Sequence, residues 1–284
     1  MANRLPDMSS FFKLSGGSGG SGGPPPPGNG RGFPFQQMSG MLGTPFGGMM
    51  RNQNTNQSFQ ASPVPRPPVE TFYSPLAAHE EAAYSEALKD PCCICLTELD
   101  MNDSQDRVVK LNKCSHLFHQ SCAKQAMENR AQCPRCMVWY CAALGNQPHG
   151  STMSISYMNG RPVPGYPGAD GFIVISYSLP DGTQDSTHPR PGRHFYGTHR
   201  TAYLPNNPAG QEVLELMRFA FNQRLTFTVG DSVTTGQKDV VTWNGIHHKT
   251  STHQGPFGYP DDTYLSRVKD ELAAYGITIE NMRR

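Results

Sequence analysis

The chain has 284 residues and a formal net charge of +1 at pH 7, so its overall charge does not indicate binding to nucleic acid or to an anionic membrane. Gly and Pro fill 24 of the first 68 positions, and that stretch holds a single Val and no Ile. Such a segment cannot bury enough apolar surface to offset the entropy of ordering, which excludes a single 284-residue globule. No run of 18 apolar residues predicts a membrane span, and the first residues lack the apolar core of a signal peptide.

We therefore expect residues 1–74 to form a disordered, low-complexity tail. Gly, Ser and Pro dominate residues 15–27, which is typical of a flexible linker with a short polyproline II piece at 24–27. Residues 75–90 are rich in good helix formers and predict a helical lead-in, with Pro75 suited to its first turn and Pro91 following its end.

The cysteines are clustered. Seven of the eight lie between Cys92 and Cys136, and Cys141 follows closely. Without a secretion signal, such clustering indicates metal ligands rather than disulfides, and we expect a reducing compartment, the cytoplasm or the nucleus.

Cysteine and histidine residues in this region form four close pairs, enough for two tetrahedral Zn²⁺ sites. Their order is Cys92-x2-Cys95-x18-Cys114-x-His116-x2-His119-x2-Cys122-x10-Cys133-x2-Cys136. Two arrangements are open at this point: consecutive fingers built from adjacent pairs, or interleaved sites in which the first pair joins the third and the second joins the fourth. Cys93 and Cys141 do not fit the ligand spacing, and we expect inert thiols there.

The composition after Cys136 predicts a small α+β domain over residues 143–284. Runs rich in β-branched and aromatic residues predict strands at 172–179, 225–229 and 240–243. Apolar residues at helical spacing predict helices at about 208–223 and 262–275. Strands and helices in this order favour an α+β architecture.

The spacing over residues 92–136 resembles a RING finger with two central histidines, within a domain of residues 91–140. The resemblance implies the interleaved, cross-brace arrangement and a large contribution of the metal to folding. One zinc would then be held by Cys92, Cys95, His119 and Cys122, and the other by Cys114, His116, Cys133 and Cys136.

A RING finger implies ubiquitin ligase activity without a covalent intermediate. Such a domain holds a ubiquitin-charged conjugating enzyme (E2) so that an incoming amine reaches the thioester, and positioning supplies the rate gain. Ile94 and Pro134 occupy the positions through which family members contact the E2. Met137 stands where active RING fingers often carry a basic residue.

The sequence that follows resembles the C-terminal domain of the Deltex family of ubiquitin ligases, and with the RING the resemblance covers about residues 88–284. The segments that carry it include Tyr203-Leu-Pro205, Val213-Leu-Glu-Leu216, Phe227-Thr-Val-Gly230, Val241-Thr-Trp-Asn-Gly-Ile-His-His-Lys-Thr250 and Gly258-Tyr-Pro-Asp261.

The Deltex resemblance implies that this domain binds ADP-ribose or NAD⁺ and, with the RING, passes ubiquitin to a hydroxyl of ADP-ribose. Hydroxyl and backbone N–H groups suit a pyrophosphate, an arginine supplies charge, and aromatic rings offer stacking faces. The candidate ligand residues are Arg200, Ser232, Thr234, Thr235, Gly236, Trp243 and His247.

Ester formation requires a general base close to the attacking hydroxyl. The family uses a histidine just before the Gly-Tyr-Pro segment and a glutamate in the last helix. Glu271 matches the glutamate, but Phe257 stands at the histidine position and cannot accept a proton. His253, four residues earlier, is then the candidate histidine.

The implied partners are an E2, ubiquitin and protein substrates, including ADP-ribosylated ones. Met137 and Phe257 favour an alternative hypothesis, a non-catalytic reader of ADP-ribosylated partners with a structural RING. A third hypothesis, an enzyme acting on NAD⁺ itself, lacks an acid pair that we can place.

Overall fold

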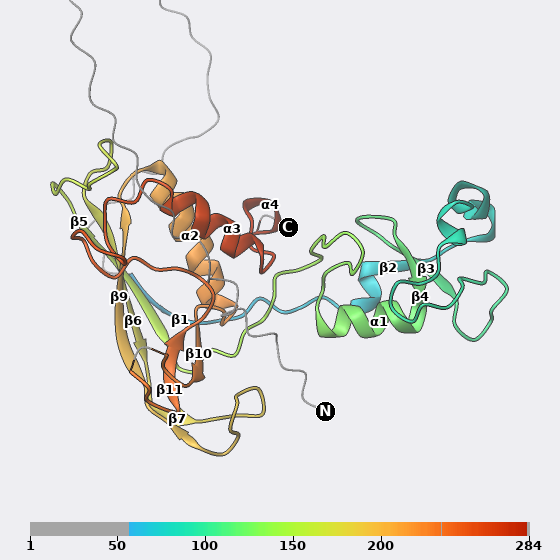
Figure 1. The fold of residues 1–284 in the computed structure, drawn as a ribbon, viewed down its shortest axis with the longest axis horizontal. Coiled ribbons are helices and arrows are strands. Elements are labelled where there is room, and N and C mark those ends of the chain that lie inside the picture. Colours follow the sequence, from blue (N-terminus) through green and yellow to red (C-terminus); the bar gives the residue numbers. More distant parts are fainter. Residues whose placement is uncertain (1–56, 234, 283–284) are drawn as a thin grey trace, which may run out of the picture. The chain divides into compact units, whose positions relative to one another are not determined.

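Two hydrophobic cores divide the part of the chain that the computed structural model describes, residues 57–233 and 235–282. One core lies in the part that carries the predicted RING finger, called the RING part, and the other lies in the C-terminal part. Figure 1 shows the helices and strands of both parts. The expected disorder of residues 1–56 and the polyproline II piece lie outside the described residues. None of the helices in the described ranges is long and apolar enough to cross a membrane.

The RING part is built on a small antiparallel sheet and one α-helix. The strand order is β2-β3-β4, and α1 follows directly on β4. Val109, Leu111, Phe118 and Met127 are almost completely buried between them. The elements are η2 (Val69–Phe72), β2 (Tyr73–Pro75), η3 (Ala78–Tyr84), η4 (Ala87–Lys89), β3 (Val108–Leu111), β4 (Leu117–His119) and α1 (Gln120–Asn129).

The C-terminal part combines a four-stranded antiparallel sheet, two smaller hairpins and helices, which confirms the predicted α+β class. The strand order of the main sheet is β1-β5-β6-β9. In chain order, the elements of the C-terminal part are β1 (Gln57–Gln60), β5 (Thr152–Met158), β6 (Phe172–Leu179), β7 (Gly182–Thr183), β8 (His194–Phe195), β9 (Thr198–Pro205), α2 (Pro208–Asn222), β10 (Phe227–Gly230), β11 (Val240–Trp243), α3 (Tyr264–Ala273) and α4 (Ile279–Met282).

Helix α2 packs its apolar side against the main sheet, and α3 lies beside α2 (Figure 1). The ring of Phe221 in α2 lies 5.6 Å from the ring of Tyr177 in β6. Asn207 starts the helix because its side chain accepts a hydrogen bond from the N–H of Gly210 at 2.8 Å. Only glycine fits at position 210, since a Cβ there would lie 1.8 Å from the carbonyl oxygen of Pro205.

The segment before the RING is structured from residue 57, which corrects the expected extent of the disordered tail. Strand β1 pairs antiparallel with β5, with Phe59 opposite Met153, and Phe59 also contacts Phe221 edge-on at 6.1 Å. Farther along, β2 pairs with β3 of the RING part. Residues 57–75 therefore contribute one strand to each part, and the RING sequence is inserted between two paired strands of the C-terminal sheet.

The predicted helical lead-in at 75–90 is also corrected, since the structure has two short 3₁₀ segments there, η3 and η4. Neither buries a single residue completely. Without an apolar face to pack, good helix formers alone do not sustain an α-helix of this length. Glu80 is instead held by an ion pair with Lys110 of β3.

Candidate functional site

The first Cys/His cluster joins two distant segments of the RING part. Cys92, Cys95, His119 and Cys122 place one ligand atom each within 4.8 Å of one another. The first two lie on a tight turn, in which the N–H of Leu96 donates to the carbonyl of Cys92 at 2.8 Å. His119 ends β4, and Cys122 lies in the first turn of α1.

The second cluster is formed by Cys114, His116, Cys133 and Cys136, whose ligand atoms also lie within 4.8 Å of one another. Here the N–H of Met137 donates to the carbonyl of Cys133 at 2.9 Å, so the turn repeats the hydrogen bond of the first Cys-x2-Cys pair. The structure therefore brings the eight residues together in the interleaved arrangement that the RING resemblance implies, and not as consecutive fingers.

Further hydrogen bonds orient the ligands. The His119 ring has Nδ1 3.3 Å from Cys95 Sγ, while its Nε2 lies 3.0 Å from the carbonyl of Glu98. A ligating histidine commonly donates its other ring N–H to a carbonyl in this way, which fixes its tautomer. Hydrogen bonds from Thr97 lower the pKa of Cys95 to about 6 and so favour its thiolate.

Three cysteines and one histidine at each cluster form a donor set typical of structural zinc. The converging donor atoms, the short Cys-x2-Cys turns and the hydrogen bond between the His119 ring and the carbonyl of Glu98 all fit such an ion. Zinc bound by both clusters would cross-link segments that share only a small apolar core. Cys93 is exposed and Cys141 half-buried, and neither belongs to a cluster.

Apolar side chains stand exposed beside the two clusters. Ile94 and Pro134, the predicted E2 contacts, are both exposed. Leu96 and Met137 are exposed as well, by 75% and 56%. Arg135, two residues before Met137, forms an exposed ion pair with Asp90 at 2.8 Å.

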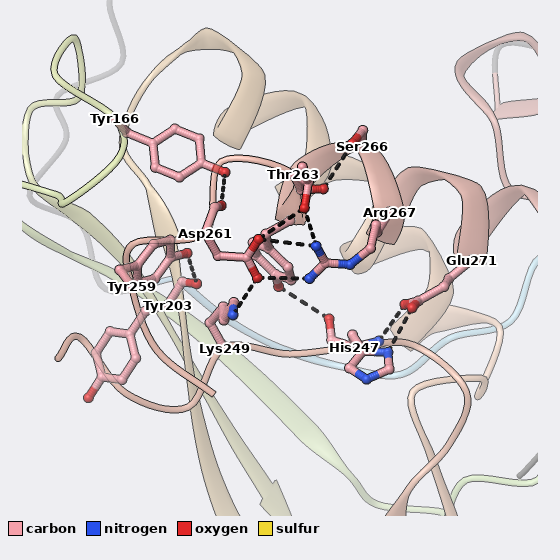
Figure 2. Close-up of polar contacts among 11 residues, drawn as sticks. Tyr166, Tyr203, His247, Lys249, Tyr259, Asp261, Thr263, Ser266, Arg267 and Glu271 are labelled. Atoms are coloured by element: carbon pink, nitrogen blue, oxygen red, sulfur yellow. Dashed lines mark hydrogen bonds and ion pairs between the residues drawn. The ribbon is translucent and has the colours of Figure 1, made fainter. Parts of the chain in front are cut away.

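In the C-terminal part, His247 and Glu271 form a close pair (Figure 2). Nδ1 of His247 lies 2.7 Å from Oε1 of Glu271, and the backbone N–H of His247 donates to Oε2, also at 2.7 Å. This hydrogen bond and the charge of Glu271 raise the pKa of His247. The His247 side chain is 55% exposed, whereas Glu271 is mostly buried, so the carboxylate orients a ring that solvent and ligands can reach.

The neighbouring His248 has a different environment. It is buried, donates from Nδ1 to the carbonyl of Ile246 at 2.8 Å and accepts at Nε2 from the hydroxyl of Tyr177 at 2.9 Å. Burial lowers its pKa to about 4, so it is neutral at physiological pH. Of the two adjacent histidines, His247 is therefore the one with an exposed ring and a raised pKa.

Sequence reasoning paired Glu271 with His253, whereas the histidine that is hydrogen-bonded to Glu271 in the described residues is His247. His253 lies exposed in the loop before Phe257, and within the described ranges its side chain makes no hydrogen bond. Phe257 is itself exposed, and its carbonyl accepts from the N–H groups of Thr250 and Ser251. The sequence predicts His247 to be a ligand-binding residue and does not pair it with Glu271.

The remaining predicted ligand residues lie on three elements. Arg200 is on β9 and donates to the carbonyl of His199 at 3.0 Å. Ser232, Thr235 and Gly236 form a turn in the loop between β10 and β11, where the N–H of Gly236 donates to the carbonyl of Ser232. Thr234 lies outside the described residues. The contact of these groups with a pyrophosphate stays a prediction.

Trp243, at the end of β11, is part of an aromatic stack. Its ring stacks on Phe227 at 4.5 Å and on His248 at 4.3 Å, and Tyr177 contacts it edge-on. This stack joins the β10–β11 hairpin to the segment that carries His247. The predicted stacking of Trp243 on a ligand is not tested by this arrangement.

Comparison with known proteins follows the same division of the chain. Residues 90–137 match the ring finger domain family, and residues 144–277 match the Deltex C-terminal domain family. A human protein named "Probable E3 ubiquitin-protein ligase DTX3" is 46% identical over 196 residues, which cover 68% of this chain and 54% of that protein. The human "E3 ubiquitin-protein ligase DTX1" is 35% identical over 219 residues, covering 69% of this chain and 35% of the relative.

A third relative, the mouse "E3 ubiquitin-protein ligase DTX4", is 36% identical over 208 residues, covering 67% of this chain and 33% of its own. The chain thus contains a RING finger followed by a Deltex C-terminal domain, and it belongs to the Deltex family. It spans about half the length of the DTX3 relatives and about a third of the other two.

Proposed function

We propose that this protein is a RING-type E3 ubiquitin ligase that recruits a ubiquitin-charged E2 and promotes transfer of ubiquitin to protein substrates. The observation that carries the proposal is the pair of interleaved Cys₃His clusters with Ile94 and Pro134 exposed beside them. The names of the relatives support it. Because the RING supplies no nucleophile, its contribution is to hold the E2 thioester in a geometry that an amine can attack.

We further propose that the C-terminal part binds ADP-ribose or NAD⁺ and directs ubiquitin to a hydroxyl of ADP-ribose. The exposed His247 ring, oriented by Glu271, supports this step because a neutral imidazole that donates through Nδ1 accepts a proton at Nε2. The hydroxyl oxygen attacks the thioester carbonyl carbon, forming a C–O bond as the C–S bond breaks. The hydroxyl proton passes to His247, and the E2 cysteine leaves as a thiolate.

A discharge assay with a ubiquitin-charged E2 tests the ligase activity. We expect the full chain to accelerate loss of ubiquitin to free lysine, and Ile94→Ala to abolish the acceleration. Val64→Ala is a matched control, since Val64 is an exposed aliphatic residue outside the RING part. Absence of discharge across a broad panel of E2 enzymes would contradict the proposal.

Calorimetry with ADP-ribose tests the ligand. We expect binding by the full chain and weakened binding by His247→Ala, with His149→Ala as the control because His149 is also exposed. If ADP-ribose binds but no ubiquitin ester forms, the alternative function, a non-catalytic reader of ADP-ribosylated partners, is favoured by Phe257 at the family's histidine position.

The proposed place of action is the cytoplasm or the nucleus. Clustered cysteines that serve as metal ligands rather than disulfides are typical of a reducing compartment, and the two Cys₃His clusters use six of the eight cysteines. Fractionation of cells that express the full chain tests this location.

A further inference from the structure

A single carboxylate, that of Asp261, contacts both segments that carry the His247–Glu271 pair (Figure 2). Its Oδ2 lies 2.7 Å from Lys249 Nζ and 2.8 Å from a terminal nitrogen of Arg267, whose other terminal nitrogen lies 3.1 Å from Oδ1. Lys249 follows His247 by two residues, and Arg267 precedes Glu271 by one turn of α3. Asp261 therefore links the His247 segment to the Glu271 helix.

The carboxylate is shielded from water on the Lys249 side. The Lys249 side chain is only 7% exposed, and its ammonium lies over the rings of Tyr264 at 5.4 Å and Tyr259 at 6.0 Å. A charge this buried requires a partner, so Lys249 and Asp261 depend on each other. Hydrogen bonds and charge from Arg267 and Lys249 hold the pKa of Asp261 well below its usual range, so it stays ionised.

Asp261 is itself fixed to the rest of the C-terminal part. Its carbonyl accepts a hydrogen bond from the hydroxyl of Tyr166 at 2.7 Å. The hydroxyl of Tyr259, two residues earlier, donates to the carbonyl of Tyr203 in β9 at 2.9 Å. The N–H of Tyr203 donates in turn to the carbonyl of Lys249 at 2.8 Å. We call Lys249, Asp261 and Arg267 the clamp. These hydrogen bonds join the clamp to the main sheet.

The His247–Glu271 contact joins two separate segments of the chain, so its geometry depends on how those segments are held together. More than half of the His247 side chain is exposed, and the two residues come from elements 24 positions apart. The hydroxyl of Tyr264, the first residue of α3, donates to the carbonyl of His247 at 3.2 Å, so one end of the helix contacts this segment directly. The bridge through Asp261 joins the segment to Arg267, which lies between Tyr264 and Glu271 on the same helix.

We propose that Asp261 is a positioning residue for the transfer to ADP-ribose, holding the His247 segment and the Glu271 helix at the spacing that the hydrogen bond between His247 and Glu271 needs. This inference rests on the proposed function of the pair as the proton acceptor. Asp261 itself touches neither the acceptor nor ubiquitin in this account, because its carboxylate is occupied by Lys249 and Arg267.

The charged groups around His247 determine whether a substitution raises or lowers its pKa. Glu271 and Arg267 face it from α3, and Lys249 from its own segment; Glu271 raises the pKa of His247, whereas Arg267 and Lys249 lower it. Loss of the Arg267 charge alone would therefore raise the His247 pKa. Loosening of the Glu271 contact, which has the largest effect, would lower it.

The experiment follows the His247 ring by NMR across pH in the full chain, for Asp261→Asn, Arg267→Gln and the adjacent control Asp262→Asn. Asp262 is exposed and carries the same charge. We expect a lowered His247 pKa in both clamp variants and no change in the control. Arg267 is half-exposed, so its replacement tests the clamp even if Asp261→Asn reduces folding. An unchanged or raised His247 pKa in Arg267→Gln would overturn the proposal.

A second readout measures ester formation on ADP-ribose against discharge to free lysine. We expect the clamp variants to lose about tenfold to a hundredfold of the ester rate, as misplaced catalytic groups do, with lysine discharge unchanged. Equal ester rates in Asp261→Asn, Arg267→Gln and wild type would also overturn it. If wild type itself forms no ester, the proposed function fails, whereas the NMR titration still decides whether Asp261 positions the pair.

Discussion

Leu96 and Met137 occupy equivalent positions in the two zinc turns. Each directly follows the second cysteine of a Cys-x2-Cys pair, and each has a left-handed backbone, with φ of 65° and 61°. Each N–H donates to the carbonyl of the first cysteine, and each side chain is exposed. Each turn therefore presents one large exposed apolar side chain close in sequence to a predicted E2 contact, Leu96 after Ile94 and Met137 after Pro134.

The first prediction concerns Met137, which stands where a basic residue often bridges the E2 and ubiquitin. Met137→Arg should accelerate lysine discharge several-fold, about tenfold at most, because a guanidinium there adds charge-assisted hydrogen bonds to ubiquitin carbonyls. Single-turnover rates measure the effect. Met137→Gln is the control, since it has similar length without charge, and equal rates for the arginine and glutamine variants would contradict the expectation.

The second prediction uses the left-handed backbone at Leu96. Leu96→Gly removes the side chain at a position that glycine adopts without strain, so zinc content and thermal stability should not fall. Discharge should nevertheless drop, by about tenfold if the side chain contributes about 1.4 kcal/mol to E2 binding. A variant that binds two zinc ions and discharges the E2 as wild type does would show that Leu96 lies outside the contact surface.

Zinc removal should affect the two parts of the chain differently. A strong chelator should release two zinc ions and unfold the RING part, because much of its stability comes from the metal. The C-terminal part should stay folded, since its core contains no metal cluster among the described residues. Amide NMR spectra taken before and after chelation distinguish the parts. Simultaneous collapse of the signals of Tyr177 and Phe221 would contradict this independence.

The pH dependence of ester formation should follow His247. Its pKa is raised by Glu271, so the proton-accepting form appears as pH rises through that raised value, and the ester rate should increase with it. Glu271→Gln removes the charge and weakens the hydrogen bond. The midpoint should then move to lower pH, while the plateau rate falls because the ring is no longer oriented.

Rates measured from pH 5.5 to 9 in wild type and Glu271→Gln check this expectation, with His149→Ala as the control. The E2 thioester must be saturating so that its own titration is constant. A midpoint that does not move in Glu271→Gln would mean that His247 is not the group observed.

Much of the zinc site could be predicted because ligand chemistry restricts spacing. Tight Cys-x2-Cys turns are visible in sequence, and the pairing of distant turns followed from the family resemblance. Strand β6 and helix α2 were also predicted almost to the residue, since β-branched residues fill the strand and Val213, Leu214, Met217 and Phe221 form one buried helix face.

Strands β1, β5 and β9 were not predicted, for a physical reason that β1 illustrates. Its four residues, Gln57–Gln60, include one apolar side chain, and they form a strand because β5 offers a free edge and Phe59 packs on Phe221. Such a strand depends on long-range pairing that local composition does not reveal. In β5, buried Met153 and Ile155 alternate with Ser and Thr, a weaker signal than a continuous apolar run.

The sequence did not predict that His247 is hydrogen-bonded to Glu271, because two residues 24 positions apart can be close in space. His253 is closer to the family's histidine position, but its loop carries it to the surface. His247 contacts Glu271 in a segment that is joined to α3 by the ion pairs of Lys249, Asp261 and Arg267 and by the hydroxyl of Tyr264. The sequence did show that Arg267 and Glu271, four residues apart in a predicted helix, would lie on the same face of that helix. It did not show which histidine that face would meet.

The most direct test of the central claim is a reaction of ubiquitin-charged E2 with ADP-ribose and the full chain, analysed by intact mass before and after hydroxylamine. The account predicts a ubiquitin–ADP-ribose adduct that hydroxylamine cleaves, formed at least about tenfold more slowly by His247→Ala than by wild type or His149→Ala. Robust lysine discharge and ADP-ribose binding without any hydroxylamine-sensitive adduct would contradict it.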